Sequence, residues 1–372
     1  MKFVVVTHIA HKKKGNNFFS YEPYVREMNL WFKCVDKVRI VGAFTNDKIN
    51  NIESPYIHNN LTLKTIPEID ITSFKNSVKA IVSIPLICFK IYKAMKWADH
   101  IHLRCPSNIG LISACIQVFF PNKPKTVKYA GNWDPKSKQP WSYRLQKGIL
   151  SNSFLSRNMK VLVYGEWPNQ TKNIVPFFTA TYSEKELIPI PLKSLKSQIQ
   201  LIFVGGLTPG KQPLISIQVC HSLLKLGKDV SLDIYGEGVE RARLEEYIAT
   251  NKLQSHVRLH GNVSKEYIKK AFQKSHFLLF ISKSEGWPKV VAEAMMWGCI
   301  PITSKVSCIP FMLADGKRGS LVNANVHEIS SEILSYLESP EMYFQKSKNA
   351  VKWSQKFTLE YFESQIKLLL KN

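Results

Sequence analysis

The chain has 372 residues, 45% of them hydrophobic, and a formal net charge of +23. This length exceeds what one hydrophobic core usually supports and fits two domains, and the apolar content excludes a disordered chain. No apolar run approaches the roughly 20 residues that a membrane-spanning helix needs, and the short run after Met1 does not read as a signal peptide.

Strand-like and helix-like runs alternate through the first half of the chain. Strands are predicted over 2–7, 37–41, 100–104, 127–130 and 161–164, and helices over 21–32 and 76–97. A polar stretch, 192–200, follows two prolines and predicts a linker.

The alternation then begins again. Strands are predicted over 201–204, 230–235, 257–260, 277–281 and 299–303, and helices over 213–226, 239–250, 340–353 and 359–370. Such alternation predicts parallel sheets with helices on both faces. The predicted fold is α/β, with two Rossmann-like doubly wound domains that face each other across a cleft. The predicted limits are 1–190 and 191–354, and a C-terminal helix at 355–372 is expected to return to the first domain.

The positive charge is concentrated in the first half. Residues 1–190 carry 27 Lys and Arg against 12 Asp and Glu, whereas residues 191–372 carry 24 against 16. This excess predicts acidic partners such as phosphorylated substrates, nucleic acid or phospholipid headgroups. Lysines that only solvate the surface would give the same excess. Seven scattered cysteines without a C-x-x-C pair indicate reduced thiols in a cytosol, with neither a disulfide framework nor a zinc site.

A glycine-rich loop follows the predicted strand 201–204. Gly205 and Gly206 allow backbone N–H groups to approach an anion closely, and the next helix adds the positive end of its dipole. Lys211 is placed to reach a phosphate as a point charge. An ordinary strand-to-helix turn with a solvated lysine remains the alternative. The spacing matches neither a P-loop nor a dinucleotide fingerprint.

Two glutamates, Glu285 and Glu293, follow the predicted strand 277–281. Pro288 suits the first position of a helix, so Glu285 is predicted on the loop and Glu293 about a turn and a half into the helix. Carboxylates accept hydrogen bonds from paired hydroxyls, as on a ribose or hexose, and N–H groups near Trp287 to Val290 would suit a pyrophosphate.

These residues resemble the retaining glycosyltransferases of family 4, which have the architecture called GT-B. That family's signature is two glutamates separated by seven residues within a Glu-Gly-aromatic-Pro and Glu-Ala-Met context. The resemblance is specific over about 199–325, and the N-terminal half shows it only weakly.

The resemblance implies a role for each matching residue. Glu293 would bind the donor ribose and Glu285 the transferred sugar, with Glu285 also counted as catalytic. Lys211, with the backbone of Gly286–Val290, would hold the diphosphate. The full implied donor site comprises Gly205, Gly206, Lys211, Tyr235, Gly236, Asn262, Val263, Glu285, Gly286, Trp287, Pro288, Lys289, Val290 and Glu293. The family requires no metal, and the resemblance implies neither a metal site nor a cofactor beyond the nucleotide-sugar substrate.

Two positions depart from the family pattern. Gly206 stands where the family usually has an arginine beside the diphosphate, and Lys283, Lys289 or Arg104 are the candidates to replace it. Arg104 itself stands where the family often has an N-domain histidine. An arginine can clamp a phosphate but is a poor general base.

The N-terminal domain offers candidates for the acceptor site. His8 and His11 follow the first strand and are candidates for acceptor contact, with His11 and Arg104 counted as catalytic candidates. Gly15, Asn16, Asn132 and Trp133 complete the predicted acceptor set. Trp133 would either stack on a sugar ring or belong to the core.

The sequence therefore predicts a hexosyltransferase-type enzyme that uses a nucleotide-sugar and a glycan or lipid-linked acceptor, as in cell-surface polysaccharide or lipopolysaccharide synthesis. It is expected to be cytoplasmic. Lys12–Lys14 and the lysines in and beside the helix 76–97 would suit a peripheral position on an anionic membrane; these are Lys75, Lys79, Lys90, Lys93 and Lys96. An ordinary packed helix with lysines at its ends is the alternative. A nucleotide-sugar epimerase and a catalytically weak donor-binding homologue remain alternatives. A nucleic-acid-binding protein is disfavoured because no recognised module is present.

Overall fold

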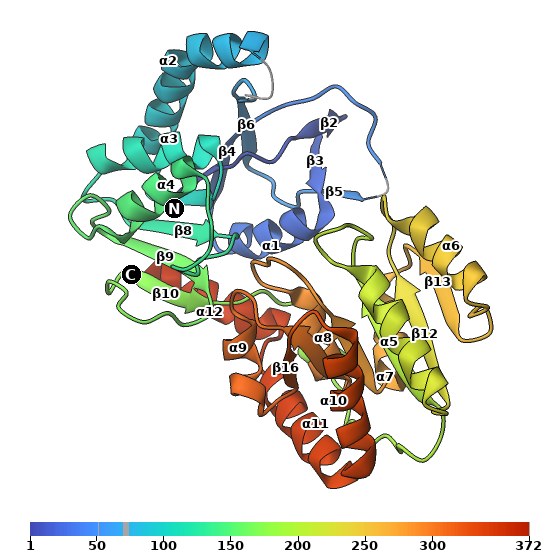
Figure 1. Cartoon of the computed structure of the whole chain (residues 1–372). Helices are drawn as coiled ribbons and strands as arrows, with labels where there is room; N and C mark the ends of the chain where they lie inside the picture. The colour runs from blue at the N-terminus through green and yellow to red at the C-terminus, as the bar shows by residue number, and fades with distance from the viewer. Residues whose placement is uncertain (51, 70–73, 372) are drawn as a thin grey trace. The chain divides into compact units, whose positions relative to one another are not determined.

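The computed structural model describes residues 1–50, 52–69 and 74–371, and for 74–80 it describes only the backbone. The chain folds as two compact units, coloured by residue number in Figure 1. Unit 1 consists of Met1–Phe178 with Tyr361–Asn372, and unit 2 of Thr179–Glu360.

Unit 1 is built on a seven-stranded parallel sheet in the order β10-β9-β8-β7-β1-β4-β6. Its strands are β1 (Lys2–Val6), β4 (Lys37–Gly42), β6 (Leu61–Thr65), β7 (His100–Cys105), β8 (Lys125–Tyr129), β9 (Met159–Tyr164) and β10 (Ile174–Phe177). The strand order reverses between β1 and β7, which makes this the topological switch point of unit 1.

The helices of unit 1 cover this sheet. They are α1 (Glu22–Phe32), α2 (Phe74–Trp97), α3 (Asn108–Ile116), η1 (Gln117–Phe119), α4 (Trp141–Ser151) and, from Tyr361 onward, α12 (Leu359–Lys371). β1 and β9 are nearly continuous runs of buried apolar residues, as expected when both faces of a parallel sheet are covered, whereas β7 and β8 also bury polar side chains, namely His100, His102, Lys125, Thr126 and Lys128. α12 is held in unit 1 by Phe362, whose ring packs 5.3 Å from that of Phe177 and 5.5 Å from that of Phe178.

Unit 2 has a six-stranded parallel sheet in the order β13-β12-β11-β14-β15-β16. The strands are β11 (Ile199–Val204), β12 (Val230–Tyr235), β13 (Val257–Gly261), β14 (Phe277–Phe280), β15 (Ile300–Ser304) and β16 (Ser320–Val322). Numbered along the unit, this is the Rossmann order 3-2-1-4-5-6, with its switch point between β11 and β14.

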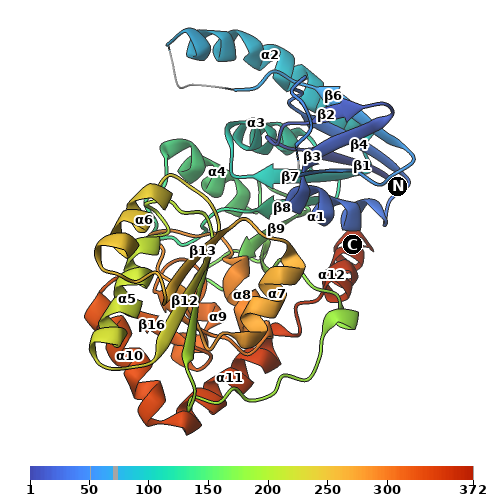
Figure 2. The same ribbon diagram turned by 90° about the vertical axis from the view of Figure 1, so that its right-hand side faces the viewer.

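Helices pack on both faces of the unit 2 sheet. They are η2 (Glu184–Glu186), α5 (Pro213–Lys225), α6 (Arg241–Thr250), α7 (Lys265–Lys274), α8 (Lys289–Met296), α9 (Ile309–Met312), η3 (Ala314–Gly316), α10 (Val326–Glu338) and α11 (Pro340–Ser354). α5 contacts α6 and α10, whereas α8 contacts α7 and α11, and Figure 2 shows the two groups on opposite sides of β12.

The predicted fold class, two Rossmann-like doubly wound domains, is confirmed. The sequence prediction missed the edge strands β6, β10 and β16, which are short or carry little apolar alternation. It also missed a small antiparallel sheet, β2 (Lys12–Lys14), β3 (Asn17–Tyr21) and β5 (Glu53–Pro55). Pro288, predicted as the first helical residue, is the N-cap of α8 instead, with φ −75° and ψ 89°.

Three loops at the carboxyl edge of the unit 2 sheet are joined through their backbones. The N–H of Gly205 donates to the carbonyl of Tyr235 at 2.9 Å, and the N–H of Leu207 donates to Glu237 at 2.9 Å. The N–H of Gly236 donates to Gly261 at 2.8 Å. Gly236 has a φ of +135°, and a Cβ on it would lie 1.9 Å from the carbonyl oxygen of Gly205. Only glycine fits there, because both the conformation and the space exclude a side chain.

We predict that Gly236→Ala lowers the free energy of unfolding by about 3 kcal/mol or more, since the methyl group forces the loops after β11 and β12 apart. Chemical denaturation would measure this change. Gly210→Ala is the matched control from the same loop region, because the nearest atom to its added Cβ, the Thr208 hydroxyl, lies at an ordinary 3.9 Å. Equal stability of the two variants would contradict the prediction.

Three histidines are buried as neutral groups in unit 1. His11 Nδ1 donates to the carbonyl of Ala43 at 3.3 Å, and its Nε2 lies 2.9 Å from the Tyr56 hydroxyl. His100 and His102 each lie 2.9 Å from the Thr126 hydroxyl. Burial lowers the pKa of His11 and of His100 to about 4, and that of His102 well below its usual value.

We predict that stability falls as the pH drops from 6.5 to 4. In this pH window the histidines bind protons in the unfolded chain but not in the folded one, so acid favours unfolding. For His11 the loss is about 3 kcal/mol over the whole window. Unfolding measured across this pH range should give a smaller loss for His11→Gln than for wild type. His327→Gln, on the exposed surface of α10, should keep the wild-type slope; a wild-type slope in His11→Gln would refute the assignment.

Candidate functional site

The predicted donor residues gather at the carboxyl edge of the unit 2 sheet. Loops after β11 and β14 flank the switch point, where open α/β sheets bind ligands. Gly205, Gly206 and Lys211 lie on the first loop, and Glu285 to Pro288 on the second. The two loops are tied by the N–H of Lys283, which donates to the carbonyl of Gly210 at 2.9 Å.

Lys211 and Glu285 meet across the switch point. Lys211 Nζ donates to Glu285 Oε1 at 2.5 Å and lies 4.8 Å from the centre of the Phe280 ring. The Glu285 side chain is only 9% exposed, whereas that of Lys211 is 29% exposed. The pair therefore places one cation and one carboxylate side by side, half shielded from water, where electrostatic interactions are stronger than at a free surface.

The turn between β15 and α9 supports the Glu285 loop. The carbonyl of Gly286 accepts hydrogen bonds from the Ser307 hydroxyl at 3.2 Å and the Cys308 thiol at 3.1 Å. The Trp287 side chain is buried against Trp353 and Phe357, with ring centres 6.3 and 6.0 Å apart. Trp287 thus anchors the loop through its ring and leaves its backbone at the edge of the sheet.

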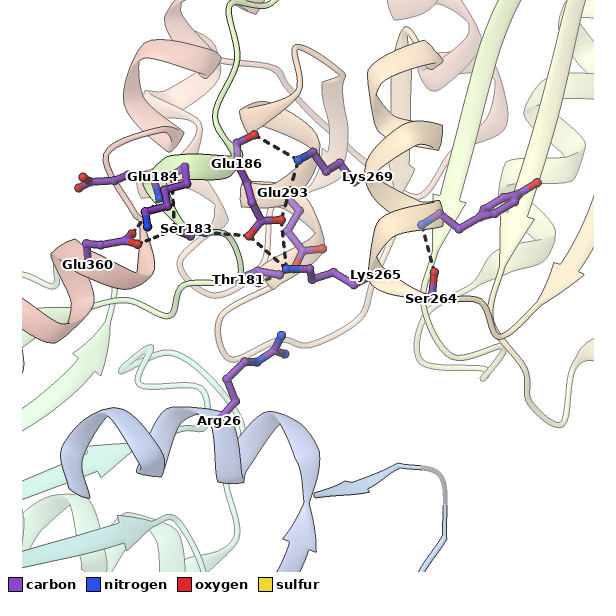
Figure 3. Close-up of polar contacts among 12 residues, drawn as sticks. Arg26, Thr181, Ser183, Glu184, Glu186, Ser264, Lys265, Lys269, Glu293 and Glu360 are labelled. Atoms are coloured by element: carbon purple, nitrogen blue, oxygen red, sulfur yellow. Dashed lines mark hydrogen bonds and ion pairs between the residues drawn. The ribbon is translucent and has the colours of Figure 1, made fainter. Parts of the chain in front are cut away.

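Glu293 lies at the fifth position of α8, within the same end of unit 2. Its Oε1 accepts a hydrogen bond from the Thr181 hydroxyl at 2.6 Å (Figure 3). Lys289 and Val290 form the first turn of α8, where helix N–H groups and the positive dipole end favour an anion. The loop and helix positions predicted for the two glutamates from their spacing agree with this arrangement.

A polar cluster beside Glu293 was not predicted from the sequence. Glu186 accepts hydrogen bonds from Lys265 at 3.2 Å, and Lys269 donates to the Glu186 carbonyl at 3.1 Å (Figure 3). Both lysines lie over the Tyr182 ring, at 5.0 and 5.9 Å from its centre. Burial and the nearby Glu293 raise the pKa of Tyr182. The i,i+4 spacing of the lysines is the one sequence signal for this cluster, and nothing in the sequence connects Thr181 to it.

The loops after β12 and β13 carry the remaining donor candidates. Tyr235, at the end of β12, stacks on His260 with ring centres 4.5 Å apart, and His260 Nε2 lies 2.6 Å from Asp233 Oδ1. Gly236 is the close-packed glycine described above. Asn262 is exposed and Val263 half-buried just beyond β13. Burial raises the pKa of the Tyr235 hydroxyl, so this residue stays neutral.

Gly206, at the position where the family usually has an arginine, leaves open space beside its backbone. A Cβ at Gly206 would meet only the Thr208 methyl at 3.7 Å and the Glu237 carbonyl at 3.9 Å, both ordinary contacts. Among the named substitutes, Lys283 is exposed next to the site and Lys289 begins α8. Arg104 belongs to unit 1 and is already paired there.

In unit 1, a cavity of about 210 Å³ lies at the switch point between β1 and β7. Its lining includes His8 after β1, Ser107 and Asn108 at the start of α3, and Tyr143 of α4. Burial and the nearby Arg104 lower the pKa of His8, which favours its neutral form. Among the predicted acceptor residues, His8 therefore lines this cavity.

The structure does not bring the other unit 1 candidates to this cavity. Arg104 donates to Glu27 at 2.8 Å and lies over Tyr24, and His11 is fully buried. Burial argues for a structural role for His11, whereas the Arg104 side chain is 13% exposed and is engaged by Glu27.

The last predicted acceptor residues lie in turns and in the core. Two roles were predicted for Trp133, stacking on a sugar ring or packing in the core, and the structure favours the core. Trp133 is buried, packs edge-on against Tyr129 and donates to Gln170 at 2.9 Å. Gly15, with φ +59°, and Asn16 form the turn of the β2–β3 hairpin. Asn132 Oδ1 accepts a hydrogen bond from the Asp134 N–H at 2.9 Å within its own turn.

The described part of the chain holds neither a metal-binding cluster nor a helix suited to span a membrane. No group of three or more His, Cys, Asp or Glu side chains there is placed to hold a metal ion. None of the helices described is both long and apolar enough to span a bilayer.

The chain is similar to known glycosyltransferases. Residues 184–353 match the family model "Glycosyl transferases group 1". An uncharacterized glycosyltransferase of Methanocaldococcus jannaschii is 27% identical over 160 residues, which are 43% of this chain and 44% of that protein. The poly(glycerol-phosphate) alpha-glucosyltransferase of Bacillus subtilis is 23% identical over 184 residues, 49% of this chain and 27% of that enzyme. The match therefore spans less than half of either relative.

The solved structures extend the likeness to both units. HepE of Anabaena, in complex with UDP-glucose, covers 100% of this chain and 99% of its own, with a TM-score of 0.66 and 15% identity. At that identity the likeness shows the fold, which is GT-B. Residues 184–353, which lie in unit 2, are thus similar in sequence to the group 1 glycosyltransferases, and both units share the GT-B fold.

Proposed function

We propose that this protein is a retaining glycosyltransferase that moves a hexose from a nucleoside-diphosphate sugar to a hydroxyl of a glycan or lipid-linked acceptor. The observation that carries this proposal is the pairing of Lys211 with Glu285 at the switch point of unit 2, with Glu293 close behind on α8. A cation, a helix N-terminus and two carboxylates at one sheet edge match the chemistry of a diphosphate, a ribose and a sugar.

The proposed mechanism assigns a task to each group. Lys211 and the first turn of α8 stabilise the negative charge that grows on the leaving diphosphate, which is the electrostatic contribution a protein supplies most directly. Glu285, released from Lys211 as the diphosphate arrives, accepts hydrogen bonds from sugar hydroxyls. Glu293 accepts hydrogen bonds from the ribose, and the Thr181 hydroxyl fixes the orientation of its carboxylate. The acceptor hydroxyl then attacks the anomeric carbon on the face from which the diphosphate leaves. The bond from this carbon to the diphosphate breaks, and the leaving phosphate oxygen takes up the hydroxyl proton.

The named relatives support a sugar donor and a polymeric acceptor. HepE was solved with UDP-glucose, and the Bacillus subtilis relative is named for glucosylation of poly(glycerol-phosphate). We propose by analogy a nucleotide-hexose donor and an acceptor from surface polysaccharide or lipopolysaccharide synthesis. The cavity at His8 in unit 1 is the proposed acceptor site.

We propose a cytoplasmic location, with peripheral attachment to a membrane. The seven cysteines are all free thiols, and burial raises the pKa of Cys220, Cys299 and Cys308 to about 12, which keeps them protonated and inert. The large positive charge of the first half of the chain supports attraction to an anionic surface.

Donor binding should be visible as thermal stabilisation. A ligand that binds only the folded state at 100 times its Kd adds about 2.7 kcal/mol. We expect one member of a panel of nucleotide-sugars and nucleoside diphosphates to raise the melting temperature of wild type. Glu293→Ala should abolish the shift, because it removes the carboxylate that accepts hydrogen bonds from the ribose, while Glu338→Ala on α10 should retain it. No shift with any member would reject the proposed donor site.

Turnover should depend on Lys211. We expect Lys211→Met to reduce kcat by about a hundredfold or more, as when a single charge-stabilising donor is removed from an active site. Release of nucleoside diphosphate from the donor identified above measures this rate, and Lys274→Met on α7 serves as control. A loss confined to KM would assign Lys211 to ground-state binding alone. Sugar conversion that is independent of any acceptor would favour the epimerase alternative.

A further inference from the structure

The outer face of α2 exposes an unusual amount of apolar surface. Ile81 is 65% exposed, Val82 74% and Phe89 59%, and Ile84, Leu86 and Tyr92 are exposed as well. The opposite face, with Ile87, Ile91 and Met95, is buried in the core of unit 1. The helix is therefore apolar on both its core face and its outer face. Large contiguous apolar surface on a folded protein marks an interaction site.

This exposed face belongs to the first half of α2, which extends beyond the rest of unit 1. Figures 1 and 2 both show this end of the helix projecting away from the sheet. After Phe89 the exposed positions include the basic residues Lys93 and Lys96 beside Tyr92. The surface thus gains positive charge along the helix. Lys75 and Lys79, predicted to contribute to such a surface, have side chains outside the described part of the structure.

A basic hollow of about 450 Å³ adjoins the apolar face, between α2 and the edge strand β6. Its cations are Arg39, Lys64, Lys90 and Lys93, and its lining includes Phe89 but no carboxylate. Phe89 therefore contributes to both surfaces, and Lys93 Nζ lies 5.2 Å from the centre of its ring. Apolar contact and positive charge meet at this residue.

The charge in the hollow has no acidic counterpart among the residues described. None of the four cations forms an ion pair with a described carboxylate. Lys90 Nζ donates to the carbonyl of Thr65 at 2.8 Å. The Arg39 guanidinium lies 3.8 Å from the Trp97 ring centre, and its buried Nε lacks a hydrogen-bond partner. Like charges gathered in one hollow repel one another, and an anion that enters it relieves this repulsion.

We propose that the hollow binds the phosphate headgroup of an anionic membrane lipid while the exposed face of α2 enters the adjacent bilayer interface. Val82, Leu86 and Phe89 contact the acyl region, and Arg39 and Lys93 contact the phosphate. An apolar face beside a cationic one matches the layered chemistry of a bilayer surface, which a soluble phosphate ester does not offer. This assignment concerns unit 1 alone and does not depend on the donor chemistry of unit 2.

Co-sedimentation of the full chain with vesicles tests the proposal. We expect binding to phosphatidylcholine vesicles that contain phosphatidylglycerol, and little binding to phosphatidylcholine alone. The double variant Val82→Ser with Leu86→Ser should lose binding. Arg39→Gln with Lys93→Gln should weaken it about 25-fold, since each charge near an anionic surface contributes about fivefold.

Matched controls separate this site from general attraction. Phe154→Ser removes an exposed apolar side chain elsewhere in unit 1 and should bind as wild type does. Arg157→Gln with Lys172→Gln removes two exposed charges and should stay within about twofold, because those charges act from farther away. Circular dichroism and thermal melting verify the fold of each variant.

Unaltered binding by the Val82→Ser, Leu86→Ser variant would overturn the proposal, and so would equal binding of the wild type to neutral vesicles. An equal loss of binding in the Arg157→Gln, Lys172→Gln control would also overturn it. The fourth such outcome is displacement of the protein from vesicles by glycerol phosphate at matched phosphate concentration. The last would indicate a site for a soluble phosphate ester. Nucleotide-induced melting shifts in the same preparations test unit 2 separately, so failure of vesicle binding leaves the donor proposal standing, and failure of the shifts leaves the lipid proposal standing.

Discussion

The contact between Gly236 and the carbonyl oxygen of Gly205 is the constraint on which the arrangement of unit 2 depends. Without a Cβ at position 236, the loop after β12 closes directly onto the loop after β11. Backbone hydrogen bonds then join these loops to the end of β13. The first loop is thereby fixed at the switch point, and Lys211 at its far end reaches Glu285 on the loop after β14. Backbone packing thus fixes where these loops lie, and the side chains of Lys211 and Glu285 supply the charged groups.

The charged groups of the proposed donor site are partnered without a ligand. Lys211 neutralises Glu285, and Thr181 satisfies one oxygen of Glu293. These contacts keep the side chains oriented and spare them the cost of isolated buried charge. A diphosphate can replace Glu285 as the partner of Lys211, because it brings more negative charge to the same lysine. Binding would then free a carboxylate for the sugar hydroxyls, which couples recognition of the two parts of a donor.

Unit 1 uses its polar groups differently. Arg104 on β7 pairs with Glu27 on α1, and His11 is hydrogen-bonded to Ala43 and Tyr56, whereas His8 is exposed. The proposed lipid-binding surface lies on α2 and beside β6, an edge strand separated from β1 by β4. An enzyme with a lipid-linked acceptor would gain from such a surface, because attachment concentrates it where the acceptor is.

The sequence by itself determined the parallel α/β fold and the placement of Glu285 on a loop and Glu293 on a helix, because apolar periodicity and the Glu-Gly-Trp-Pro context are local signals. Only the tertiary structure decided that Thr181 contacts Glu293 across 112 residues of sequence and that Lys211 pairs with Glu285. It also decided that His11 and Trp133 are buried, since residue type does not tell which side of a loop faces the core. The edge strand β6 was missed for a related reason. Its pairing with β4 is a contact between segments distant in sequence, which its own five residues do not reveal.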